Sequence, residues 1–361
     1  MTLYLLLPLP AIIAALLSSR LQVKGLLAIW CISATLTVIL MPMGSGDYSN
    51  YLLDFNSINE QPLASVIVKD PLYATVVWLF GHLGGAGTVF YAGLAILGLG
   101  IKLFAVRSLS GGRSLPVALY MCSFFFLHDF TQIRAGLAIG LWMLALSQLS
   151  RGPLRYLLLT SLATLIHIQA ALGFVLLGML AVVRTRSGLR AASLVSLVVV
   201  LASATRVFDQ WGYALLSTIP DPRVNIYLMM AGQDRWVRPN PFSVMSLLAL
   251  LVAFSGIWLP NRSMGIANTL LPATRSTSTA VFLALLMGSC ALALLSSVTV
   301  AAFRISEHFF SLLPVGIWLA ACRGRTVPRH TWPLWLLASL FLYIFLFYSP
   351  YLLELPSNLV F

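Results

Sequence analysis

Four short polar segments interrupt this largely apolar sequence and carry residue types that could do chemistry. The first, residues 44–51 (GSGDYSNY), combines the carboxylate of Asp47 with an amide and the rings of Tyr48 and Tyr51. A carboxylate and an amide suit sugar hydroxyls and aromatic faces suit pyranose rings, so this segment predicts contacts with a glycan. The structural alternative is a solvated turn in which Asp47 caps a short helix.

The second segment, residues 128–134, leads into an apolar helix. Arg134 is expected about one turn inside that helix, where a charge is costly unless it is paired or faces water. Because a planar guanidinium binds phosphate oxygens in pairs, Arg134 is a candidate diphosphate ligand, with His128 and Gln132 as neighbouring contacts. The alternatives are a structural pair with Asp129 or snorkelling to the interface.

Two further segments supply candidate acids and bases. His167 is expected at the tip of an apolar hairpin, either as a catalytic group or as a hydrogen-bonded packing residue. Arg304, Glu307 and His308 have the i, i+3, i+4 spacing that places side chains on one helical face. They predict a polar patch, although an Arg304–Glu307 pair that only offsets its own burial remains open.

The composition restricts the elements that can position these residues. Of 361 residues, 60% are hydrophobic and 9% are charged, and the mean hydropathy is +0.94. Soluble domains contain about 25% charged residues, so a water-soluble enzyme is excluded. The charge is also too sparse for a nucleic-acid binder. The four cysteines form no CxxC pair or Cys/His cluster, so neither a disulfide framework nor a zinc site is expected.

The fold expected is an all-α polytopic membrane protein, with one transmembrane domain over residues 1–361. Because about 20 apolar residues cross a bilayer, the apolar runs predict about twelve spans. They lie near residues 3–19, 25–43, 86–106, 115–128, 131–149, 154–166, 168–183, 191–205, 242–259, 277–301, 308–322 and 332–349. The segment 71–84 is short and is expected to lie in the interface. It belongs to an external loop over 44–85, and a second long external loop covers 206–241.

The distribution of charge predicts the orientation of the chain. Basic residues in short loops mark the cytoplasmic side, which places Arg20, Lys102 and Arg113 inside. The same topology places all ten acidic residues outside, Asp129 among them. The four polar segments therefore face the outer side.

Missing motifs narrow the chemistry. The sequence has no carboxylate cluster typical of Mg²⁺ or Mn²⁺, and no GxSxG, HExxH or P-loop motif. No metal or other cofactor is therefore expected. Phosphate chemistry would depend on arginine charge, with a histidine or carboxylate as the base.

The ordered motifs resemble those of the EpsG-type exopolysaccharide polymerases. Residues 46–51 resemble the family's G-x-DY-x-NY opening, and residues 132–138 (QIRAGLA) its R-x-x-x-A helix start. Residues 165–167 (LIH) match its hairpin histidine, and residues 303–310 its late arginine helix. The pair Glu307-His308 departs from the pattern, which more often has an aromatic residue there.

The resemblance implies a Wzy-like O-antigen or exopolysaccharide polymerase of the bacterial inner membrane, with a metal-independent, GT-C-like fold. Such enzymes use undecaprenyl-diphosphate-linked glycans as donor and acceptor on the periplasmic side. Membrane lipids and a chain-length regulator protein are the further partners it suggests, and nucleic acid is not one.

On this hypothesis Arg134 and Arg304 stabilise the leaving diphosphate. The groups that orient or deprotonate the acceptor would be Asp47, His167, Glu307 or His308, and those that contact the substrate Tyr48, Tyr51, His128 and Gln132. A flippase or transporter for lipid-linked sugars, and an O-antigen ligase, are the alternatives.

Overall fold

The computed structural model describes residues 8–45, 47–67, 70–125, 128–129, 132–183, 185–219, 222–231, 240–258, 272–321 and 337. These residues are helical or lie in turns and loops, and their only β-type pairing is an isolated bridge between Arg20 and Arg113. The chain divides into two compact units. Unit 1 comprises Met1–Gly173 with Thr326–Phe361, and unit 2 comprises Phe174–Arg325.

Unit 1 carries the helices of the first half of the chain, and α6 and α8 form its most extensive helix pair. Its elements are α1 (Leu9–Leu17), α2 (Val23–Gly44), α3 (Tyr48–Asn59), α4 (Leu63–Val66), α5 (Pro71–His82), α6 (Gly87–Leu109), α7 (Ser114–Ser123), α8 (Ile133–Gln148), η3 (Leu149–Arg151), α9 (Pro153–Ile166) and η4 (Ile168–Ala171).

Unit 2 is built around α16, which packs against α11, α14 and α17. Its elements are most of α10 (Leu172–Val182), then α11 (Arg186–Ala202), η5 (Ser203–Thr205), α12 (Asp209–Ser217), α13 (Pro222–Ala231), α14 (Val244–Trp258), α16 (Pro272–Leu294), α17 (Thr299–Phe310) and α18 (Leu313–Ala321).

Proline and glycine set the boundaries that matter for the site. Pro71 and Pro153 begin α5 and α9, where a helix loses no hydrogen bond to proline. Gly111 and Gly112 have φ angles of 66° and 79°, so the chain turns sharply between α6 and α7. That turn lets the N–H of Leu21 donate to the carbonyl of Gly112 at 2.9 Å.

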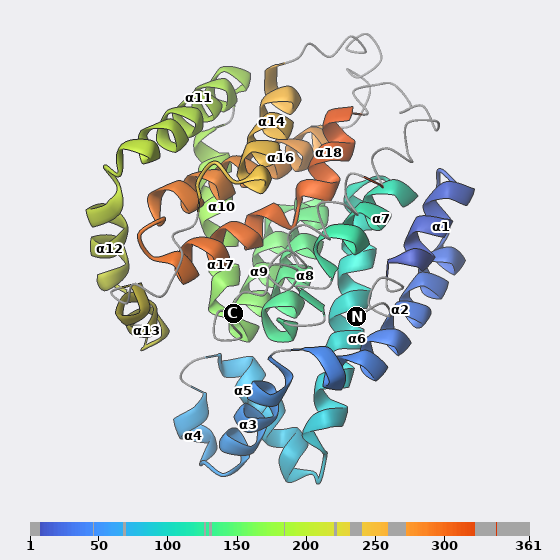
Figure 1. Cartoon of the computed structure of the whole chain (residues 1–361). Helices are drawn as coiled ribbons and strands as arrows, with labels where there is room; N and C mark the ends of the chain where they lie inside the picture. The colour runs from blue at the N-terminus through green and yellow to red at the C-terminus, as the bar shows by residue number, and fades with distance from the viewer. Residues whose placement is uncertain are drawn as a thin grey trace. The chain divides into compact units, whose positions relative to one another are not determined.

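The α1–α2 and α6–α7 loops therefore lie together at one end of unit 1. Arg107 Nε donates to the carbonyl of Leu21 at 2.8 Å. The backbones of Arg20 and Arg113 form the isolated β-bridge. This agrees with the predicted placement of Arg20 and Arg113 on one side. Helices α2 and α6 run in opposite directions, and α3 to α5 pack beside the other end of α6 (Figure 1). The arrangement agrees with an interfacial segment 71–84, which stays a prediction.

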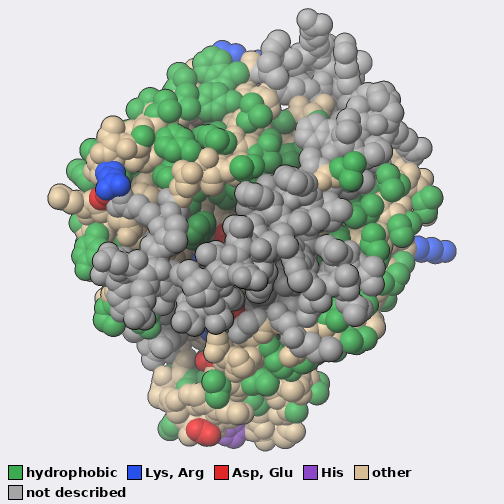
Figure 2. Space-filling view, in the orientation of Figure 1, with side chains coloured by type: hydrophobic (Ala, Val, Ile, Leu, Met, Phe, Trp, Pro, Cys, Tyr) green, Lys and Arg blue, Asp and Glu red, His purple; other side chains and the backbone are tan. Residues whose placement is uncertain are grey.

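The helices identify a multi-pass membrane protein. Among the described residues five helices are long and apolar enough to span a bilayer: Val23–Leu40, Gly87–Leu109, Ile133–Arg151, Arg186–Thr205 and Thr277–Leu294. A sixth candidate is Val300–Phe310 with Leu313–Ala321, bent by 42°. Figure 2 shows a surface on which hydrophobic side chains are widespread and charges scattered. Such a surface suits contact with lipid.

The boundaries predicted for two late spans are wrong. In place of the predicted spans 277–301 and 308–322, the structure has α16, which ends at Leu294, α17, which begins at Thr299, and α18, which begins at Leu313. The break, residues 295–298 (LSSV), contains no proline, glycine or charge, so the pattern used to divide the spans does not reveal it. The predicted loop 206–241 contains α12 and α13, while its residues 220–221 and 232–239 lie outside the described residues. The predicted last span, 332–349, lies outside them except for Leu337.

Lys102 and Asp129, which the charge count placed on opposite sides, form a buried ion pair. Lys102 Nζ lies 2.6 Å from Asp129 Oδ1, and each side chain is 1% exposed. Tyr120 donates to Asp129 Oδ2 at 3.0 Å. The count treated both charges as loop residues, whereas Lys102 lies within α6 and is neutralised by its partner.

Gly136 and Gly140 of α8 pack closely against Lys102 and the chain around His128. A Cβ at Gly136 would overlap the carbonyl oxygen of His128 and lie 2.8 Å from Lys102 Nζ, and one at Gly140 would lie 2.9 Å from Lys102 Cγ. The two glycines therefore form the space through which the lysine crosses α8 to reach its acid.

Candidate functional site

A polar cluster in unit 1 is centred on Arg134, the second residue of α8. Gln132 stands at the N-cap of this helix, and its carbonyl accepts the N–H of Gly136 at 2.7 Å. The Arg134 side chain is 26% exposed. The helix start therefore holds the guanidinium at a fixed position while leaving part of it accessible.

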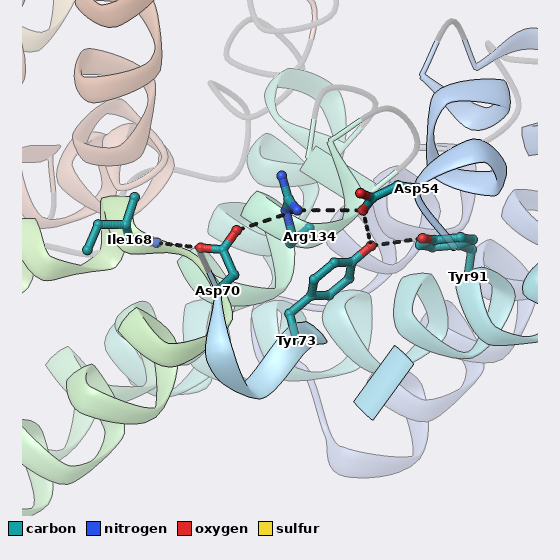
Figure 3. A network of polar contacts seen from close by, with 6 residues as sticks. All are labelled: Asp54, Asp70, Tyr73, Tyr91, Arg134 and Ile168. Carbon is teal, nitrogen blue, oxygen red and sulfur yellow. Dashed lines mark hydrogen bonds and ion pairs between the residues drawn. The ribbon is translucent and has the colours of Figure 1, made fainter. Parts of the chain in front are cut away.

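Two carboxylates and an aromatic ring surround this guanidinium (Figure 3). Arg134 Nη1 lies 3.4 Å from Asp70 Oδ2 and 3.8 Å from Asp54 Oδ2, and Cζ lies 4.8 Å from the centre of the Tyr73 ring. These contacts offset the cost of a charge near a membrane span. The alternative pairing of Arg134 with Asp129 is wrong. In the described part of the chain both ion pairs use Nη1, and neither uses Nη2 or Nε.

A chain of hydroxyl groups connects the cluster to α6. Tyr73 donates to Asp54 Oδ2 at 3.1 Å, and the hydroxyls of Tyr73 and Tyr91 lie 2.8 Å apart. Burial raises the pKa of Tyr73 well above 10.0, and the neighbouring Tyr91 and Asp54 raise it further. Tyr73 therefore stays protonated at neutral pH. Since its single proton goes to Asp54, Tyr91 is the donor in the bond between the two phenols.

Helix α3 contributes one face to the same cluster. Asp47, Tyr51 and Asp54 follow one another at intervals of four and three residues, the spacing of a single helical face. The rings of Tyr51 and Tyr91 lie 5.0 Å apart and are tilted by 37°. Asp47 stands at the N-cap of α3, as the alternative of a helix-capping Asp47 predicts. Its side chain, however, makes no capping hydrogen bond. Tyr48, the first residue of α3, is half-buried.

Asp70 brings the turn at His167 to the cluster. Asp70 is the N-cap residue of α5, its side chain is 3% exposed, and its Oδ1 accepts the N–H of Ile168 at 3.4 Å (Figure 3). His167 is the extended residue between α9 and η4, as the sequence predicts for the hairpin turn. A buried carboxylate needs such partners, and here Arg134 and the Ile168 amide supply them.

A family model described as the EpsG family matches residues 26–358. The chain belongs to the EpsG family. No curated protein and no solved structure matches it. The match covers most of both units and confirms the family that the sequence motifs resemble. EpsG-family proteins are associated with glycosyltransferase-like polymerases, which suggests a polysaccharide polymerase-like role for this chain.

In this EpsG-family protein His128 lies in the core of unit 1. His128 is fully buried, its ring stacks with Phe124 at 5.6 Å between ring centres, and it precedes the Asp129 that pairs with Lys102. The sequence groups His128 with Arg134 because they are six residues apart. The fold also places Asp54 and Asp70, far away in sequence, against the arginine.

The late segment belongs to unit 2. Arg304, Glu307 and His308 all lie on α17, as their spacing predicts. Arg304 and Glu307 are half-buried, whereas His308 is fully buried and meets the Phe309 ring edge-on at 5.6 Å. The helical face is therefore confirmed, and within it Arg304 and Glu307 are the accessible members.

Sequence reasoning missed four members of the Arg134 cluster: Asp54, Asp70, Tyr73 and Tyr91. Two signals could have found the acids. Asp54 continues the helical spacing from Asp47 and Tyr51, and Asp70 precedes a proline at a position typical of a helix start. The tyrosines gave no comparable signal, because their hydroxyls meet only through the packing of α5 on α6.

Proposed function

We propose that this EpsG-family protein is a polysaccharide polymerase that joins undecaprenyl-diphosphate-linked repeat units. The observation that carries the proposal is the partly exposed Arg134 guanidinium, held at the start of α8 by Asp54, Asp70 and the Tyr73 ring. The fold proposed is a GT-C-like arrangement of about twelve spans with an interfacial segment 71–84. The active site would face the periplasm from the inner membrane.

The chemistry assigned to Arg134 is stabilisation of the leaving group. When the bond between the anomeric carbon and the diphosphate breaks, negative charge develops on the phosphate oxygens. A guanidinium stabilises that charge most effectively when its position is fixed before the reaction. Because the ion pairs of Arg134 use Nη1, its Nη2 and Nε edge suits the paired contacts that phosphate favours. Arg304 is proposed as the second diphosphate ligand.

The surrounding residues suit the glycan parts of the two substrates. Tyr48 and Tyr51 offer aromatic faces, and Gln132 offers an amide beside Arg134. His128, near the start of α8, is proposed as a further substrate contact. For orienting or deprotonating the acceptor hydroxyl, the sequence proposes Asp47, His167, Glu307 and His308. His167 lies next to the backbone amide that binds Asp70, which supports its place near Arg134.

The test is complementation of a strain that lacks its own polymerase. Arg134→Ala and Arg304→Ala should each abolish the ladder of long polysaccharides while the protein remains in the membrane. Arg134→Lys keeps the charge but loses the fork geometry, so its ladder should be shorter.

Arg155→Ala is the matched control, because Arg155 is exposed at the start of α9 and makes no ion pair among the described residues. It should leave the ladder unchanged. Normal ladders from both Arg134→Ala and Arg304→Ala would contradict the proposal.

A further inference from the structure

Two carboxylates share Arg134, but they differ in accessibility. Asp70 is 3% exposed and is bound by the Ile168 amide, whereas Asp54 is 40% exposed. A nearly buried carboxylate with two partners suits a structural role. The exposed carboxylate at the same arginine is the one that a second substrate can reach.

The contacts of Asp54 are concentrated on one of its oxygens. Oδ2 accepts the Tyr73 hydroxyl at 3.1 Å and lies 3.8 Å from Arg134 Nη1. Within the described residues, no hydrogen bond or ion pair involves Oδ1. Tyr73 is itself 2.8 Å from the Tyr91 hydroxyl, so the carboxylate is fixed by two hydroxyls in series. This arrangement holds Oδ2 in place and presents Oδ1 as the acceptor for a proton.

The faces around Asp54 also suit a sugar. Tyr51 precedes Asp54 by one helical turn and lies against Tyr91, so aromatic surface stands beside the carboxylate. Asp47, the carboxylate that the sequence motif favours, lies two turns earlier on the same helix, about 10 Å along its axis from Asp54 at 1.5 Å per residue. Asp54 is the residue of this helical face whose carboxylate lies 3.8 Å from Arg134 Nη1.

We propose that Asp54 is the general base that activates the acceptor hydroxyl, with Tyr73 and Tyr91 as positioning residues. The inference rests on the proposed function and assigns the base to Asp54, in place of the candidates that the sequence proposes. Asp54 takes the proton of the acceptor hydroxyl as the oxygen forms a bond to the anomeric carbon of the donor. The bond from that carbon to the diphosphate breaks, and the diphosphate leaves with the electron pair beside Arg134. Asp54 then returns its proton to water.

The experiment uses the full-length protein in liposomes and the lipid-linked repeat units that accumulate in a strain lacking it. Asp54→Ala should lower the rate of chain extension at least about 100-fold, the usual effect of removing a general base. Azide needs no deprotonation, so adding azide to Asp54→Ala should restore cleavage of the donor and yield the glycosyl azide. A residue with a structural role only would not respond to azide.

Two variants control the result. Glu60→Gln changes an exposed carboxylate at the end of the same helix and should extend chains at the wild-type rate. Asp54→Asn retains the size and the acceptor oxygen for Tyr73, so it should fold even where Asp54→Ala does not, and it should be as slow in extension.

Three outcomes would overturn the proposal. Extension by Asp54→Asn at the wild-type rate excludes Asp54 as the base. A folded Asp54→Ala that stays inactive with azide, while binding the lipid-linked donor as wild type does, assigns Asp54 a different role. A wild-type protein that binds the donor but never extends it removes the proposed function, and the assignment of Asp54 falls with it.

Discussion

Replacing Lys102 by methionine tests whether the buried pair with Asp129 holds the core of unit 1 together. The substitution keeps the length of the side chain but leaves Asp129 buried with only the Tyr120 hydroxyl among the contacts above. Breaking a buried pair by removing one partner costs about 3–5 kcal/mol. Protonation of the stranded Asp129 carboxylate sets an independent upper limit on this cost. With a reference pKa of about 3.9, neutralising an aspartate at pH 7 costs about 4 kcal/mol.

The assay is SDS titration of the purified protein in mixed micelles, followed by circular dichroism. Lys102→Met should lower the free energy of unfolding by about 3–4 kcal/mol at pH 7, the range in which these two limits overlap. If the stranded Asp129 carboxylate takes up a proton in the folded variant, the loss in free energy of unfolding should shrink by about 1.4 kcal/mol for each pH unit below 7.

The double variant Lys102→Met/Asp129→Asn separates the charge from the packing. It removes the unpaired charge, so most of the lost stability should return. Wild-type stability in Lys102→Met, or a double variant as unstable as the single one, would refute the reasoning that this ion pair is buried and mutually neutralising.

Three further predictions test the same unit. Gly136→Ala should destabilise the protein strongly, because the added Cβ meets the His128 carbonyl. Gly93→Ala is the control and should not, because a Cβ there has no atom within 4 Å. Thermal unfolding in detergent compares the two variants. Asp70→Ala leaves the Ile168 amide without its acceptor and should cost about 1–3 kcal/mol in the SDS titration; an unchanged value would contradict the contact. Above pH 10 the unfolded chain releases the Tyr73 proton while the folded chain keeps it. Stability should therefore fall with rising pH, and less steeply in Tyr73→Phe, as unfolding at pH 8 and 10.5 would show.

The sequence predicted local features of the fold well. The hairpin turn at His167, the helix that begins before Arg134 and the shared helical face of Arg304 and Glu307 depend on nearby residues, and the structure shows all three. Periodicity and the positions of proline and glycine are local signals, so they survive without knowledge of the packing.

The partners of the charged residues could not be predicted in the same way. Arg134 is 80 residues from Asp54 and 64 from Asp70, and no local pattern records those contacts. Lys102 and Asp129 were assigned to opposite sides because charge counting treats every charge as a loop residue. A paired charge inside a helix bundle breaks that assumption.

Chain growth by the purified protein tests the central claim most directly. Full-length protein in liposomes, given lipid-linked repeat units and followed by gel electrophoresis of the released glycans, should produce a ladder of lengths that Arg134→Ala cannot make. Translocation of the lipid-linked units without any chain growth, or an unchanged ladder from Arg134→Ala, would contradict a polymerase whose leaving diphosphate is stabilised by Arg134.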